Sequence, residues 1–174
     1  MKIARLNSKI LTEDIYKKIS DDKITLLDTY INNLIKEKMK TKDILRVGLT
    51  NDQNLQNNQK IALNKIQFNG VNSNQLIHYD DGIKIGEGVS KVKITACIFH
   101  TKTGGMDYCW DSIKKNGIDI AINIGGYGTS GYGSCSFPTL TIDVKKDDVI
   151  TLSVLEQTLV RSGGNTWLEV AVLE

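Results

Sequence analysis

Residues 91–100 read KVKITACIFH, and this stretch decides the class of fold. Val92, Ile94, Ala96 and Ile98 occupy every second position, and mostly polar residues fill the positions between them. Successive side chains of a β-strand point to opposite faces, so this spacing predicts a strand with one buried face. The chain around it is therefore expected to form a β-sheet that is covered on one side.

The same alternation recurs on both sides of this stretch. The further candidate strands are residues 61–68, 75–79, 82–85, 107–115, 119–124, 140–144, 148–157 and 166–174. Turn signals such as Asn69-Gly70, Asp81-Gly82 and Asn116-Gly117 separate them. About eight to ten short strands with no helix between them predict a mainly β, antiparallel sandwich. The final strand is expected to be tied into a sheet.

The N-terminal part has a different pattern. Residues 12–42 contain neither Gly nor Pro, and they are predicted to form one long helix. Its apolar seam has the 3, 4, 3 spacing of a heptad repeat and consists of Ile24, Leu27, Ile31 and Leu34. Such a stripe must pack either on the following domain or on copies of itself, and we expect self-association. Residues 1–44 are thus interpreted as an arm and an oligomerisation helix, and residues 45–174 as a head domain.

Composition excludes several classes of protein. The 174 residues include 22 Lys+Arg and 20 Asp+Glu, and a net charge of +2 argues against a strongly basic nucleic-acid-binding protein. No apolar run is long enough for a transmembrane helix or for the core of a signal peptide. We therefore expect synthesis in a cytoplasm and no insertion into a membrane. Three cysteines do not describe a disulfide framework.

No motif in the sequence predicts catalysis or a cofactor. Cys97, His100, Cys109 and Cys135 include metal-ligating residue types, but Cys97 and His100 lie three apart on one strand and should point to opposite faces. Neither a nucleophile elbow, an HExxH motif nor a Walker A motif is present. We expect no catalytic residues, no metal and no cofactor, and hence a protein that is not an enzyme.

The glycine-rich stretch GGYGTSGYGS, residues 125–134, suggests binding instead. Tyr127 and Tyr132 stand between glycines, with hydroxyl side chains nearby, and tyrosines in such a setting suit a sugar or a flat protein surface. Close packing between subunits is the alternative explanation. With Asn123 and Asp107, these tyrosines form the predicted ligand-binding set.

Three segments in sequence order resemble a known family. They read IKKNGIDIAI (residues 113–122), TLTIDVKKDDVITLSVLEQ (139–157) and GGNTWLEVAVLE (163–174). They resemble the trimeric jelly roll of the complement-globular-head and tumour-necrosis-factor superfamily, in which a Lys-Asn-Gly hairpin precedes a Gly-Asp turn and a final aromatic strand. Asp147-Asp148 replace Gly-Asp here, and residues 89–92 lack the Tyr of the family's Gly-x-Tyr strand.

The resemblance implies a homotrimer with a jelly-roll head. Bacterial and phage members of this group commonly end tail fibres and receptor-binding proteins, so the expected function is attachment of a phage or phage-like tail to a host cell-surface polysaccharide or protein. The expected location is the virion tail, with other tail or baseplate proteins as further partners through the N-terminus. A purely structural virion or baseplate component and a bacterial surface-attached jelly-roll ligand are the alternatives.

Overall fold

The computed structural model describes residues 23, 25–26, 29, 43–71, 74–102 and 107–174. The chain divides into two units, Met1–Thr41 and Lys42–Glu174, and the second is the head described below. The predicted helix seam Ile24, Leu27, Ile31 and Leu34 lies outside the described residues, as does the arm of residues 1–11. The N-terminal helix, the domain boundary at residue 44 and the role of the seam therefore stay predictions.

The described part of the head is built from β-strands. In chain order they are β1 (Ile44–Gly48), β2 (Gln53–Leu55), β3 (Lys65–Asn69), β4 (Leu76–Tyr79), β5 (Gly82–Ile85), β6 (Lys91–Thr101), β7 (Tyr108–Lys115), β8 (Ile118–Tyr127), β9 (Tyr132–Asp143), β10 (Val149–Val154), β11 (Thr158–Val160) and β12 (Trp167–Val172). Each of the nine predicted strand segments overlaps one of these strands. β1, β2 and β11 were not predicted individually.

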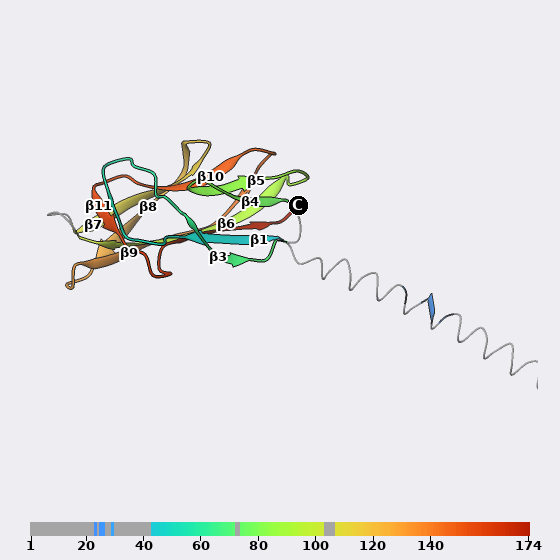
Figure 1. Ribbon diagram of the computed structural model, residues 1–174, viewed down its shortest axis with the longest axis horizontal. Coiled ribbons are helices and arrows are strands. Elements are labelled where there is room, and N and C mark those ends of the chain that lie inside the picture. Colours follow the sequence, from blue (N-terminus) through green and yellow to red (C-terminus); the bar gives the residue numbers. More distant parts are fainter. Residues whose placement is uncertain (1–22, 24, 27–28, 30–42, 72–73, 103–106) are drawn as a thin grey trace, which may run out of the picture. The chain divides into compact units, whose positions relative to one another are not determined.

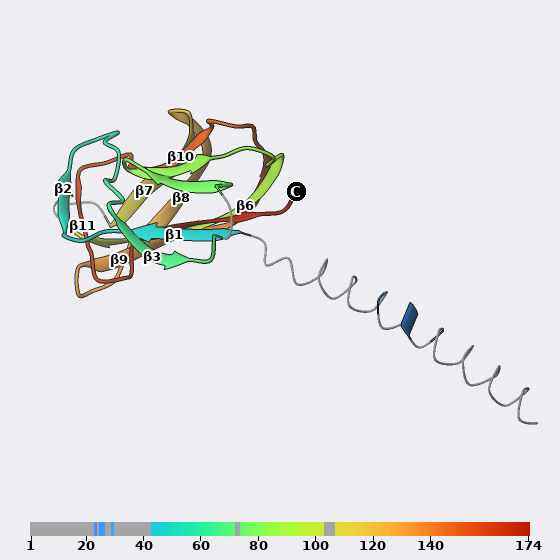
Figure 2. The same cartoon turned by 45° about the vertical axis from the view of Figure 1, so that its right-hand side comes forward.

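The strands form two layers that face each other. One layer has the order β3-β1-β12-β6-β9, and the other has the order β8-β7-β10-β5-β4. All of the pairings are antiparallel, and the layers are joined where Gly126 and Tyr127 of β8 pair with Ser134 and Gly133 of β9. Figures 1 and 2 show β10, β5 and β4 on one side of the sandwich and β1, β3 and β9 on the other. We call the layer β3-β1-β12-β6-β9 the interface layer and the layer β8-β7-β10-β5-β4 the outer layer.

The core lies between the two layers. Along β6, Val92, Ile94, Ala96 and Ile98 are buried, while the residues between them are half-buried or exposed. β10 and β12 supply further buried aliphatic side chains. Burying each such side chain stabilises the fold by roughly 1.5–3 kcal/mol, so the alternation read from the sequence is what holds the layers together.

The final strand is tied into the sheet as predicted. β12 lies between β1 and β6, pairing Leu168 with Val47 on one side and with Ala96 on the other. β1, the first strand of the head, is therefore hydrogen-bonded to β12, the last one.

The Asn116-Gly117 hairpin is clasped to the start of β10. Asn116 has a positive φ of 53°, and Gly117 follows with a φ of 82°. The Asn116 side chain accepts a hydrogen bond from the Val149 amide (2.8 Å) and donates one to the buried Asp148 carboxylate (2.8 Å). The same carboxylate accepts a bond from the Lys145 amide at 3.0 Å. The hairpin and turn of the family resemblance are thus joined through side chains.

Replacing Asp148 with alanine should lower the free energy of unfolding by about 1–3 kcal/mol, because it leaves the Asn116 amide and the Lys145 amide without their acceptor. Burial raises the pKa of Asp148, but these hydrogen bonds and nearby lysines outweigh it and hold the pKa below 3.8. The stabilisation should therefore be present above pH 3.8 and be lost as the pH falls through the lower, folded-state pKa. Urea unfolding at pH 7 and in acid measures both effects. Asp143→Ala, at an exposed carboxylate, is the control. Equal losses of unfolding free energy in the two variants would contradict the stabilising role of the Asp148 hydrogen bonds.

Candidate functional site

The glycine-rich stretch is a hairpin more than a loop. Tyr127 is the last residue of β8 and Tyr132 the first of β9, so only residues 128–131 form the turn. The Gly128 amide donates to the Tyr132 carbonyl at 2.8 Å, and Gly131 has a φ of 76° that a side chain would strain. The two tyrosines are therefore fixed by strand geometry.

Tyr127 points into the sandwich. Its hydroxyl lies 3.1 Å from Thr158 Oγ1, and its ring meets the His100 ring edge-on with centroids 6.4 Å apart. Burial raises the pKa of Tyr127. The side chain is thus part of a polar region inside the head.

Tyr132 points the other way. It lies on the outward face of the interface layer, where its ring stacks on Phe99 with centroids 6.0 Å apart and 44% of the residue is exposed. The two tyrosines of the predicted set therefore do not meet on one surface.

The other two predicted residues lie apart from this stack. The Asn123 side chain donates a hydrogen bond to the Ser136 carbonyl at 2.8 Å, which ties β8 to β9. The exposed Asp107 carboxylate pairs with Lys102 at 2.8 Å, and the hydrogen bond from Lys102 lowers the pKa of Asp107. As ligand contacts, all four residues stay predictions.

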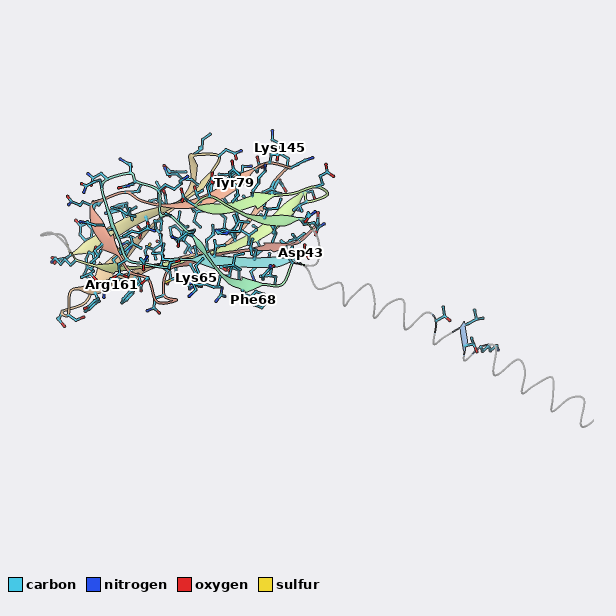
Figure 3. The ribbon with its side chains drawn as sticks, viewed as in Figure 1. Asp43, Lys65, Phe68, Tyr79, Lys145 and Arg161 are labelled. Atoms are coloured by element: carbon cyan, nitrogen blue, oxygen red, sulfur yellow. The ribbon has the colours of Figure 1, made fainter. Side chains whose placement is uncertain are left out.

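Aromatic side chains gather on the outward face of the interface layer. Phe68 on β3 is 51% exposed, and Figure 3 shows it at the edge of the head. Its register partner Arg46 lies over the Trp167 ring at 4.4 Å and forms an ion pair with Glu169 at 2.7 Å. We call Phe68, Trp167, Phe99 and Tyr132 the aromatic face.

A second apolar surface lies on the outer layer. Ile122 and Ile124 of β8 are 54% and 50% exposed, and they stand beside β7, where Tyr108 is 49% exposed and Trp110 is half-buried. We call these four residues the β8 strip. Large apolar side chains that remain exposed next to one another are typical of protein interaction surfaces.

An open pocket of about 440 Å³ lies on the outer layer between the Asn116 hairpin and β10. Two of its cations are already paired: Lys60 with Asp81 at 2.8 Å and Lys114 with Asp119 at 2.6 Å. The other lining residues are Asn58, Asn116, Gly117, Val149, Thr151 and Ser153.

A buried polar cluster inside the head was missed by the sequence analysis. His100 Nε2 lies 2.7 Å from Asp111 Oδ2, His100 Nδ1 lies 3.2 Å from Thr158 Oγ1, and both ring and carboxylate are fully buried. Cys109 joins them, since its Sγ, the His100 ring nitrogen and an Asp111 oxygen lie within 4.8 Å of one another. Burial raises the pKa of the Asp111 carboxyl, and burial together with the Asp111 carboxylate raises the pKa of Cys109 to about 12.

The predicted orientation of Cys97 and His100 toward opposite faces of their strand is confirmed. His100 points into the core and Cys97 points outward, as their spacing predicted. The inference that the metal-ligating residue types do not converge was incomplete, because β7 brings Cys109 and Asp111 to His100 from the opposite layer. The spacing of Cys109 and Asp111, two apart on an alternating strand, already placed both on the face that carries Ile113.

A two-layer antiparallel sandwich with this strand order is a jelly roll of the tumour necrosis factor type. Among solved structures, the chain is similar to murine APRIL (TM-score 0.61, 14% identity, covering 76% of this chain and 99% of that one). It is also similar to Eiger TNF from S. frugiperda (TM-score 0.61, 7% identity, covering 76% and 91%) and to rabbit GITRL (0.51, 15%, 76% and 94%).

The structural likeness confirms the jelly-roll half of the family resemblance read from the sequence. No family model and no curated protein matches the chain. Within the part of the chain that the structure describes, no helix has the length and apolar character needed to cross a membrane.

Proposed function

We propose that the chain is a non-enzymatic homotrimer that binds a receptor through its jelly-roll head, as the attachment protein of a phage or phage-like tail. The observation that carries the proposal is the pair of exposed apolar surfaces on one head, the aromatic face and the β8 strip. Phe68 in the aromatic face is 51% exposed, and Ile122 in the β8 strip is 54% exposed. Leaving two such apolar surfaces in contact with water is unfavourable, so both are expected to be covered by a partner.

Two different surfaces favour a ring of subunits. When an interface uses the same patch on both partners it forms a dimer, whereas contact between two unlike patches proceeds head to tail and gives a closed ring or an open filament, depending on the rotation between subunits. The aromatic face lies on the interface layer and the β8 strip on the outer layer, next to the β8–β9 junction. Three heads in a ring would bury the β8 strip of each head against Phe68 and Trp167 of its neighbour, in keeping with the trimeric family that the sequence resembles. Tyr132 lies at the opposite edge of this layer from Phe68 and would stay open to a ligand.

A trimeric head supports attachment through avidity. Three weak sites on one particle bind a repetitive surface more tightly than any one of them, without a new contact. A host cell-surface polysaccharide or protein is the proposed partner, and the virion tail is the proposed location, with the N-terminal residues joining the head to other tail proteins. A purely structural clamp in the virion is the second candidate, favoured by the same apolar surfaces.

Light scattering of the full chain tests the oligomeric state. A mass near three times 19.3 kDa is expected. A mass of 19.3 kDa at micromolar concentration would contradict the trimer and, with it, the attachment by avidity.

Replacing Tyr132 with alanine is expected to weaken binding to purified bacterial cell-wall polysaccharide roughly tenfold, because the exposed ring is lost from a stacking surface. The measurement is retention of the labelled trimer on immobilised polysaccharide, with its mass checked by light scattering. Tyr79→Ala is the matched control, since Tyr79 is 45% exposed on β4. Loss of the trimer would assign Tyr132 to the subunit interface, and unchanged binding would remove it from the ligand site.

A further inference from the structure

The buried cluster inside the head contains three different metal-ligating groups. His100 belongs to β6 in the interface layer, while Cys109 and Asp111 belong to β7 in the outer layer. Their ligand atoms lie within 4.8 Å of one another, and the exposed fraction of each residue is 2% or less. A nitrogen, a sulfur and a carboxylate oxygen that meet in this way are the donor types found in protein zinc sites.

The Asp111 carboxylate is only half satisfied. Its Oδ2 is paired with His100, but its Oδ1 is buried and accepts no hydrogen bond of regular geometry among the described residues, and only the weak thiol donor of Cys135 interacts with the carboxylate besides His100. A buried acceptor without a partner is costly, and native proteins rarely keep one without a reason. A cation bound next to His100 and Cys109 would give this oxygen a ligand to coordinate.

We propose that His100, Cys109 and Asp111 form a zinc-binding site that links the two layers of the head. The charges favour this set, because Zn²⁺ with one thiolate, one carboxylate and one neutral imidazole leaves no net charge in the core. On binding, Zn²⁺ takes the place of the Cys109 thiol proton, which leaves to the solvent, and no oxidation or reduction takes place. The site lies within one head and goes beyond the proposed attachment function.

The surroundings of His100 suit a ligand role. Its Nδ1 faces Thr158 Oγ1 at 3.2 Å, and that hydroxyl also lies 3.1 Å from the Tyr127 hydroxyl. A partner on Nδ1 fixes the ring orientation and directs Nε2 toward the metal, as in many zinc sites. Tyr127 supports this ring through Thr158.

Metal binding requires a small local movement. His100 Nε2 and Asp111 Oδ2 are 2.7 Å apart, whereas two such atoms on a tetrahedral zinc lie about 3.3 Å apart. Either the pair opens by about half an ångström, or the carboxylate turns so that Oδ1 becomes the ligand. The Cys135 thiol is buried and interacts with the same carboxylate, and as a neutral thiol beside the site it adds no charge to it.

The first test uses the untagged, reduced full chain after treatment with a chelator. Addition of Co²⁺ should produce one equivalent of bound metal per chain, with the thiolate-to-cobalt absorption that imidazole and carboxylate ligands alone do not give. Excess Zn²⁺ should displace the cobalt and raise the melting temperature, because a metal that binds only the folded state stabilises it. Absence of the thiolate absorption from the wild-type chain would overturn the proposal, whatever the variants do.

Two cysteine variants locate the site. Cys109→Ser should lose the thiolate absorption, whereas Cys97→Ser should keep it, because Cys97 lies on the opposite face of β6. If Cys109→Ser does not fold, the reaction of wild-type thiols with Ellman's reagent in mild urea gives a second measure. Zinc should then protect Cys109 and leave Cys97 reactive. Loss of the absorption in Cys97→Ser alone would place the metal at the surface and overturn the proposed site.

Discussion

Replacing Ile122 with lysine is expected to convert the trimer into monomers, so that the mass in solution falls from three times 19.3 kDa to 19.3 kDa. Ile122 is 54% exposed in the β8 strip, and in the proposed ring this surface is covered by the neighbouring head. A lysine ammonium placed there would be buried without a partner, which costs several kcal/mol, more than a single apolar contact contributes.

The matched control is Ile77→Lys. Ile77 is 40% exposed on β4, at the far edge of the same layer, and belongs to neither apolar surface. It should remain trimeric by light scattering and as stable as the wild type. If Ile122→Lys stays trimeric, the β8 strip is not the interface; if both variants become monomeric, the trimer depends on charge in general and not on this strip.

Replacing Asp111 with alanine should lower the free energy of unfolding by about 3–5 kcal/mol in the presence of a chelator. The substitution leaves the fully buried His100 ring without its partner at 2.7 Å. Removing one partner of a buried pair is more costly than losing a surface contact, because the remaining group is still desolvated but has lost its interaction. Urea unfolding monitored by Trp110 and Trp167 fluorescence measures the change.

A double variant separates pairing from packing. His100→Leu combined with Asp111→Leu should cost much less than the sum of the two single substitutions, because no polar group is then left unpaired. Asp107→Ala, at an exposed carboxylate on the strand's flank, should change stability by less than about 0.5 kcal/mol. A loss below about 1 kcal/mol for Asp111→Ala would show that the pair contributes little to the fold.

The sandwich was predictable from the sequence because its signal is local. β6 and β12 carry one buried residue at every second position, and the Asn116-Gly117 turn has the residue types that a positive φ requires. The short strands β2 and β11 have three residues each, too few for an alternation to be read. Two strand positions hold glycine because a neighbouring backbone oxygen passes close by. A Cβ at Gly125 would lie 2.3 Å from the Ser134 oxygen, and a Cβ at Gly133 would lie 2.5 Å from the Gly126 oxygen.

The candidate sites were less predictable because they depend on which strands become neighbours. Tyr127 and Tyr132 are five residues apart in the sequence, but the hairpin directs one into the core and the other out of it. His100 and Asp111 lie on strands of opposite layers, and their contact follows from the closure of the sandwich. The turn at Asp147 shows the reverse case: Asp147 stands where the resembled family has glycine, and its φ of 72° is one that glycine adopts freely.

The position of β12 between β1 and β6 sets the order in which the head can be completed during synthesis. Ile44 of β1 pairs with Ala171 of β12, so β1 cannot complete its pairing until nearly the whole head has been translated. Until then, the edges of β1 and β6 that β12 will cover are unpaired, and such edges are where nascent chains associate wrongly. Pairings this distant in sequence also fold slowly. The head is therefore expected to reach its native state only after translation of β12, which favours assembly of finished heads over trimer formation on the ribosome.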